Sequence, residues 1–253
     1  IGPQDAPLVV LIHGLGLTSH STWGQIVPSL AQEFLVLSYD LCSHGETSLP
    51  TGPVRLTQFA QQLIALLDFL SLEGGALIGF SLGGMINRRV AIDYPDRVTA
   101  LAILYSPHKR SEEQQKLVED RARTTSSGGP GASLDVTISR WFTDAFRTNY
   151  SDQVALVRDV VLANNANNYA AHRQVLAEGV VELICPDPPL THPSLVITCQ
   201  NDTGSTPAMS HAIAKEINGA ETIIIPNLQH LGLIEAPSAF ADPIASFLRK
   251  KIS

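Results

Sequence analysis

The stretch GGALIGFSLGGM, residues 74–85, joins a short apolar run to MINRRVAIDYP, which has the pattern of a helix. Ser81 lies at this junction, between Gly79 and Gly83. Glycines on either side of a strand-to-helix turn allow a tight backbone approach and hold the serine with its Oγ above the edge of the sheet. An ordinary turn serine is the alternative. The rest of the sequence decides whether Ser81 is a candidate nucleophile or an ordinary turn residue.

Continuous apolar runs recur on both sides of this turn. Such runs are typical of parallel strands that are buried on both faces. They comprise LVVLI (8–12), FLVLSY (34–39), ALIGF (76–80), VTALAIL (98–104), LVITC (195–199) and ETIII (221–225). Helical patterns separate the runs in the first hundred residues, and this alternation predicts a mostly parallel sheet with helices on both faces.

The alternation stops at about residue 108, where only helical patterns follow. They comprise residues 111–125, 135–147, 152–163 and 168–179, with SSGGPGAS (126–133) as a loop between the first two. The strand pattern returns after CPDPPLTHPS (185–194). The sequence therefore predicts an α/β core formed by residues 1–107 and 191–253, with a helical cap inserted at residues 108–190.

Composition excludes several classes of function. A net charge of −7 gives no basic surface for nucleic acid, and no apolar run reaches the ~18 residues of a membrane span. Cys42, Cys185 and Cys199 are odd in number and have no CxxC spacing, which indicates free thiols in a reducing, cytoplasmic compartment. We expect no metal, because the histidines lack ligand spacing, and no other cofactor. The oligomeric state stays open.

A serine nucleophile needs a base and an acid that orients the base. His230 follows the ETIII run, and Asp202 follows the LVITC run. Residues beyond the carboxyl ends of parallel strands converge in one crevice, so Ser81, Asp202 and His230 are expected to meet there. Asp202 could instead serve as a turn or helix cap. The segment after VTALAIL offers no other carboxylate before Glu112.

The segments LVVLIHGLG, SYDLCSHGETS, GFSLGGM, NDTGSTP and HLGLIEAP resemble the α/β-hydrolase superfamily, in that order. The similarity is greatest to enol-lactone hydrolases, cofactor-free haloperoxidases and small carboxylesterases. SRWFTDAF and NNYAAHRQVL, in the predicted cap, resemble the 3-oxoadipate enol-lactone hydrolases. The resemblance implies the triad Ser81, Asp202 and His230, with the Leu15 and Leu82 amides as the oxyanion hole.

Further candidate positions, and departures from the family pattern, complete the sequence prediction. Trp141, Phe142 and Tyr169 are candidate substrate contacts, although they could simply pack the cap; Arg140 and His172 are weaker candidates. His13 is expected to bond the backbone of the oxyanion loop, and Asp40 and His44 to hold their own loop. The departures are Cys42-Ser43, where the family often has Arg-Gly, and Cys199 and Gln229, where it has turn glycines. The family also places an antiparallel strand pair before the HG strand, and the chain begins without it.

Together these features predict a cofactor-independent serine hydrolase that acts on a small-molecule lactone or carboxylic ester. Enol-lactone opening is the most specific version, and it depends on the resemblance of the cap. A perhydrolase-like esterase, a thioesterase and a hydrolase of carbon–carbon bonds would use the same triad. A ligand receptor on the same fold is the alternative outside enzymes, since fold alone does not fix function.

Overall fold

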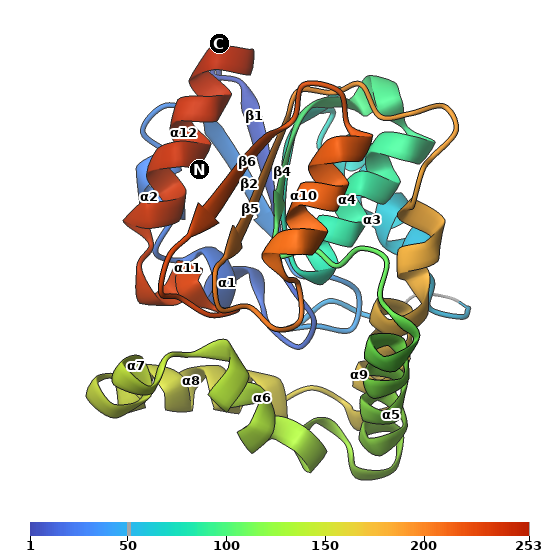
Figure 1. The fold of residues 1–253 in the computed structure, drawn as a ribbon. Helices are drawn as coiled ribbons and strands as arrows, with labels where there is room; N and C mark the ends of the chain where they lie inside the picture. Colours follow the sequence, from blue (N-terminus) through green and yellow to red (C-terminus); the bar gives the residue numbers. More distant parts are fainter. Residues whose placement is uncertain (50–51, 253) are drawn as a thin grey trace.

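The computed structural model describes residues 1–49 and 52–252, and a six-stranded sheet with only parallel pairings forms its centre (Figure 1). The spatial order of the strands is β2-β1-β3-β4-β5-β6. The strands are Leu8–Ile12 (β1), Leu35–Tyr39 (β2), Gly75–Phe80 (β3), Val98–Leu104 (β4), Ser194–Cys199 (β5) and Glu221–Ile225 (β6). The six apolar runs of the sequence are thus confirmed as strands.

The strand order indicates where a ligand-binding crevice is expected. From β1 the chain crosses to β2 on one side and then returns to β3 on the other, so the order reverses between β1 and β3. Ligands of open α/β sheets bind beyond the carboxyl ends of the strands at such a reversal. The HGLG turn after β1 and the Ser81 turn after β3 both lie at this point.

Helices cover both faces of the sheet (Figure 1). One face carries α3 (Leu56–Phe69), α4 (Leu82–Asp93) and α10 (Pro207–Glu216). The other carries α1 (Ser19–Trp23), α2 (Val27–Leu30) and α12 (Ser238–Ile252), and the short α11 (Gly232–Glu235) precedes α12. Every residue of β1, β3 and β5 is buried as a result, which explains why these strands are mostly apolar rather than alternating. The buried Ser194 and Thr198 of β5 are polar, and their hydroxyls donate to the His192 and Ser205 carbonyls.

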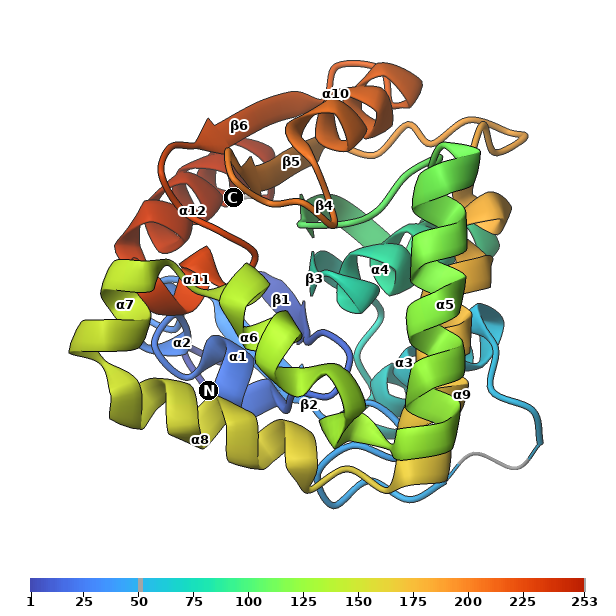
Figure 2. The same ribbon diagram turned by 60° about the horizontal axis from the view of Figure 1, so that its bottom comes forward.

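The segment between β4 and β5 is helical and lies across the carboxyl ends of the strands (Figures 1 and 2). We call its helices the cap. They are α5 (Glu112–Gly128), α6 (Leu134–Trp141), α7 (Asp144–Asn149), α8 (Ser151–Leu162) and α9 (Ala166–Glu178). In the same segment 3₁₀ turns occupy Pro130–Ser133 and Gly179–Leu183, and a further 3₁₀ turn, Pro95–Arg97, lies before β4. Helices α5 and α9 pack side by side at one end, and α6, α7 and α8 form the other (Figure 2).

Two details of the cap differ from the sequence prediction. The single helix expected over 135–147 is two helices, because Thr143 caps α7 by accepting a hydrogen bond from the Phe146 amide at 3.2 Å. The loop expected from residue 126 begins later, since α5 continues to Gly128. The Ser126 hydroxyl donates to the Ala122 carbonyl at 3.0 Å, which satisfies this polar side chain within the helix.

Within the described ranges, none of the helices has both the length and the apolar character that crossing a bilayer would need.

Candidate active site

Ser81 has a backbone conformation that few residues other than glycine adopt, with φ 55° and ψ −110°. Its amide donates to the Leu104 carbonyl at 2.8 Å, and α4 begins at the next residue. The two glycines make this turn possible. A Cβ at Gly79 would lie 2.1 Å from the Gly83 carbonyl oxygen, and a Cβ at Gly83 would lie 2.1 Å from that of Ile12. The turn therefore brings the end of β3, the start of α4 and the end of β1 into direct backbone contact.

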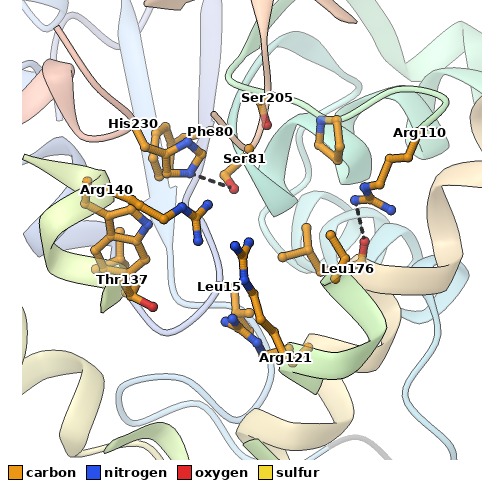
Figure 3. Close-up of a pocket in the computed structure, with 16 residues that line it drawn as sticks. Leu15, Phe80, Ser81, Arg110, Arg121, Thr137, Arg140, Leu176, Ser205 and His230 are labelled. Atoms are coloured by element: carbon orange, nitrogen blue, oxygen red, sulfur yellow. Dashed lines mark hydrogen bonds between the residues drawn. The ribbon is translucent and has the colours of Figure 1, made fainter. Parts of the chain in front are cut away.

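The structure brings Ser81, His230 and Asp202 together at the carboxyl edge of the sheet, and Figure 3 shows the first two of these side chains. His230 Nε2 lies 3.3 Å from Ser81 Oγ, and His230 Nδ1 lies 2.7 Å from Asp202 Oδ2. The other carboxylate oxygen of Asp202 accepts from the Gly204 and Ser205 amides at 2.7 and 3.0 Å. Asp202 therefore contacts the imidazole with one carboxylate oxygen and closes its own turn with the other.

Aromatic rings fix the plane of the His230 imidazole. The ring centres of Phe80, Tyr105 and Trp141 lie 5.2, 5.3 and 6.3 Å from that of His230. The cap reaches the same turn through its backbone, because the Leu231 amide donates to the Trp141 carbonyl at 2.8 Å. Trp141 thus connects the cap to the loop that carries His230.

The amides of Leu15 and Leu82 have no hydrogen-bond partner within residues 1–49 and 52–252. Leu82 is the first residue of α4, where the amide is not used by the helix itself. Leu15 lines the same cavity as Ser81. Two free amides beside a serine hydroxyl have the geometry that a tetrahedral oxyanion would require.

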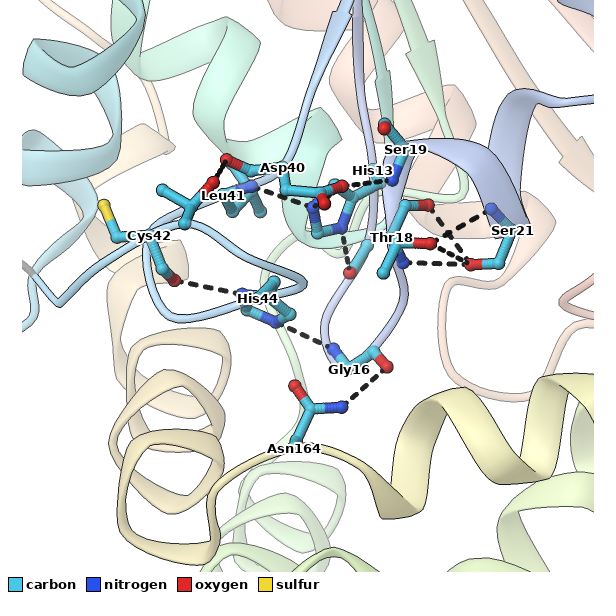
Figure 4. Close-up of polar contacts among 12 residues, drawn as sticks. His13, Gly16, Thr18, Ser19, Ser21, Asp40, Leu41, Cys42, His44 and Asn164 are labelled. Atoms are coloured by element: carbon cyan, nitrogen blue, oxygen red, sulfur yellow. Dashed lines mark hydrogen bonds and ion pairs between the residues drawn. The ribbon is translucent and has the colours of Figure 1, made fainter.

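Two histidines shape the loop that carries Leu15 (Figure 4). His13 Nδ1 lies 2.8 Å from the Gly14 carbonyl oxygen, and its Nε2 accepts from the Leu41 amide at 2.9 Å. His44 Nε2 accepts from the Gly16 amide at 3.0 Å. The backbone contact predicted for His13 is confirmed. His44 reaches further than predicted, because it holds the HGLG turn as well as its own loop.

The loop after β2 and the cap both brace this turn. Asp40 Oδ1 accepts from the Ser19 amide at 2.7 Å, and Asn164 Nδ2, which follows α8, donates to the Gly16 carbonyl at 2.9 Å (Figure 4). Ser43, which stands where the family often has glycine, has φ 61°. The left-handed conformation is thus kept without glycine, at a cost of order 1 kcal/mol.

A cavity of about 90 Å³ opens beside Ser81 and His230 (Figure 3). Core and cap residues line it together: Leu15, Leu17, Phe80, Ser81, Pro107, Arg110, Val118, Arg121, Thr137, Arg140, Trp141, Arg173, Leu176, Gly204, Ser205 and His230. Of the three predicted substrate contacts only Trp141 belongs to this set. Phe142 is buried against Phe146, and the Tyr169 ring packs on Gly16, where a Cβ would meet it at 2.6 Å.

Sequence reasoning missed Arg110, Arg121 and Arg173, which also line the cavity. These arginines are far apart in the chain and follow no spacing pattern, so no local signal marks them. Across the described ranges, no cluster of three or more His, Cys, Asp or Glu side chains is arranged to hold a metal ion.

Three buried imidazoles lie behind the oxyanion loop. His44 stacks on His172 with ring centres 4.7 Å apart and meets His13 at 5.0 Å. Burial, followed by the charge of His44, lowers the pKa of His172 to about 3, and burial also lowers the pKa values of His13 and His44. Neither ring nitrogen of His172 has a hydrogen-bond partner in the part of the chain that the structure describes. The three imidazoles are therefore neutral in the folded protein.

We expect the free energy of unfolding to fall as the pH drops below 6.5. There the unfolded chain binds a proton on His172 that the folded chain resists, so the contribution is complete above the unfolded pKa and declines toward pH 3. For His172 alone the loss at pH 5 is about 2 kcal/mol. Urea unfolding at pH 7 and pH 5 should show it, and His172→Leu should reduce the difference. The exposed His211→Gln is the matched control; an unchanged difference in His172→Leu would contradict the assignment.

Comparison with known proteins places the chain among relatives of one fold. The alpha/beta hydrolase family matches residues 9–242. The chain is 27% identical over 252 residues to 3-oxoadipate enol-lactonase 2 of Acinetobacter baylyi, covering 98% of this chain and 91% of that protein. It is also 27% identical to (E)-2-((N-methylformamido)methylene)succinate hydrolase of the same organism, over 250 residues, 97% of this chain and 91% of that protein.

Solved structures agree with this placement. The crystal structure of the enol-lactonase from Burkholderia xenovorans LB400 superimposes with a TM-score of 0.87 at 28% identity, covering 98% of this chain and 94% of that one. The expected α/β-hydrolase fold is therefore confirmed. The family match spans residues 9–242, which is nearly the whole chain. The sheet, the turn after β3 and the cap agree with that family. The protein therefore belongs to the alpha/beta hydrolase family.

Proposed function

We propose that this hydrolase is a cofactor-independent serine enzyme that cleaves a small lactone or carboxylic ester through an acyl-enzyme. The observation that carries the proposal is the chain of contacts from Ser81 Oγ to His230 Nε2, at 3.3 Å, and from His230 Nδ1 to Asp202 Oδ2, at 2.7 Å. Such a chain allows a weakly acidic hydroxyl to lose its proton as it attacks.

In the proposed first step Ser81 Oγ attacks the carbonyl carbon while His230 takes its proton. Asp202 stabilises the resulting imidazolium, and the Leu15 and Leu82 amides bind the oxyanion. The tetrahedral intermediate expels the alcohol or enol oxygen, which receives the proton from His230. In a lactone this oxygen stays attached to the acyl chain. Water, deprotonated by His230, then attacks the acyl-enzyme and releases the acid and Ser81.

The relatives support the lactone version of this reaction. One is named for 3-oxoadipate enol-lactone and another for a substituted succinate, and both align over nearly the whole chain. 3-Oxoadipate enol-lactone is accordingly the first substrate to test.

The test is covalent labelling. Wild type treated with a fluorophosphonate is expected to gain one adduct by intact mass, mapped by peptide analysis to Ser81, and to cleave p-nitrophenyl acetate and 3-oxoadipate enol-lactone. Ser81→Ala should gain no adduct. A folded wild type that is neither labelled nor active would overturn the proposal in favour of a ligand receptor.

A further inference from the structure

Four arginines line the cavity beside Ser81, and the lining holds no Asp or Glu. Arg110 precedes α5, and Arg121, Arg140 and Arg173 come from α5, α6 and α9. The guanidinium groups of Arg121 and Arg140 point into the cavity and toward one another (Figure 3). The chain as a whole is negative, with a net charge of −7, so this concentration of positive charge is a local feature of the cap.

These arginines lack the carboxylate partner that most arginines elsewhere on the protein have. Six of the eight others form ion pairs: Arg89 with Asp93, Arg97 with Asp68, Arg123 with Asp120, Arg147 with Asp144, Arg158 with Asp135 and Arg249 with Glu33. Of the other two, Arg88 donates instead to two carbonyls and the Ser106 hydroxyl. None of the four in the cavity forms an ion pair within residues 1–49 and 52–252. The Asp202 carboxylate nearby is already occupied by His230 and two amides.

Most of their hydrogen-bond donors are also unused. Arg140 reaches Thr203 Oγ1 only at 3.3 Å, and Arg173 reaches the Tyr169 hydroxyl only at 3.4 Å. No side-chain hydrogen bond of Arg121 exists within the described ranges. Arg110 is different, since it donates to the carbonyls of Leu176 and Ala177 at 3.1 and 2.9 Å and thereby ties itself to α9.

Holding these charges together is unfavourable without a ligand. Burial, followed by repulsion from Arg121, lowers the pKa of Arg140 to about 10, and burial followed by repulsion from Arg173 lowers the pKa of Arg121. A guanidinium offers donors in a fork that fits a carboxylate. Anionic ligand groups would relieve the repulsion and fill the unused donors at once.

We propose that the acyl part of the substrate carries two carboxylates, which Arg121, Arg140 and Arg173 bind beside the scissile carbonyl. A carboxylate accepts about four hydrogen bonds, fewer than the donors that the three guanidinium groups leave unused, so two carboxylates suit this cavity better than one. The small volume favours a compact diacid. This inference rests on the proposed serine mechanism and goes beyond 3-oxoadipate enol-lactone, which has one carboxylate, by adding a second charge to the substrate.

The test compares methyl esters of equal leaving group by release of methanol. Methyl butyrate is neutral, monomethyl succinate carries one carboxylate, and the 1-monomethyl ester of propane-1,2,3-tricarboxylic acid carries two. Wild type is expected to show kcat/KM rising by about tenfold or more with each carboxylate. Equal kcat/KM for the three esters would overturn the inference.

Arg121→Gln and Arg173→Gln are expected to lower the ratio of kcat/KM for the two-carboxylate ester to that for the neutral ester by about 10- to 100-fold, mainly through KM. Arg123→Gln is the matched control, because Arg123 lies on the same helix as Arg121 but pairs with Asp120 outside the cavity. It should keep the wild-type ratio. Loss of the ratio in Arg123→Gln to the same extent would contradict a specific site.

A binding experiment separates this inference from the serine mechanism. Propane-1,2,3-tricarboxylate should raise the Tm of wild type, and by less in Arg121→Gln. A Tm shift in a protein that cleaves no ester and takes no fluorophosphonate label would refute the mechanism but keep the anion site. Cleavage of esters with no preference for carboxylates, and no Tm shift, would refute the anion site but keep the serine mechanism. An equal shift with inorganic phosphate would overturn the choice of two carboxylates.

Discussion

Replacing Ser81 with Ala is expected to lower kcat for p-nitrophenyl acetate by about 10⁵- to 10⁶-fold, the largest effect of any single substitution outside the backbone of the turn. Alanine keeps the Cβ that already tolerates φ 55°, so the fold should be unchanged. Only the nucleophile is lost. Stopped assays on both proteins measure the effect, and unchanged far-UV circular dichroism and Tm establish that the variant is folded.

The same experiment with His230 tests whether the residues act as a unit. Because His230 Nε2 contacts only the hydroxyl that Ser81→Ala removes, adding His230→Ala to Ser81→Ala should cost little more activity. Asp202→Asn should cost about 10⁴-fold alone, since Asp202 sets the tautomer of His230. Fully additive losses would mean that the residues work independently, and would contradict the proposed mechanism.

The core of the fold was predictable because buried parallel strands have a strong signature. β1, β3 and β5 are buried at every position, and this constraint strongly favours apolar residues. The turn at Ser81 was predictable for a different reason. At Gly79 and Gly83, backbone atoms lie about 2 Å from where a Cβ would be, so both positions require glycine. A requirement for glycine can be read directly from the sequence.

The cavity was not predictable in the same way. Arg110, Arg121 and Arg173 meet only because α5 and α9 pack side by side over the sheet, and no sequence period records that contact. Phe142 and Tyr169 look like pocket residues in the sequence, yet an aromatic side chain on a cap helix has a second place to go, against its own neighbours. In this chain Phe142 packs on Phe146.

Replacing Gly83 with Val is expected to abolish activity, because the position has no room for a side chain. A Cβ there would lie 2.1 Å from the carbonyl oxygen of Ile12 and 2.8 Å from that of His13. Both neighbours are backbone atoms at the end of β1, and they cannot move without displacing the loop that carries the Leu15 amide. The loss of free energy of unfolding should exceed about 4 kcal/mol, in the range reserved for severe backbone conflict. Urea unfolding, soluble yield and turnover together measure it.

Gly179→Ala is the matched control, because the nearest atoms to its added Cβ are 3.5 Å away and its φ is −68°. That variant should fold and turn over substrate like wild type. Gly83→Ala tests the same contact with the smallest possible side chain, since the clash begins at the Cβ itself. If the clash is the cause, Gly83→Ala should lose most of the activity that Gly83→Val loses. A folded Gly83→Val enzyme with unchanged turnover would show that β1 can yield, and that the position of Ser81 does not depend on this contact.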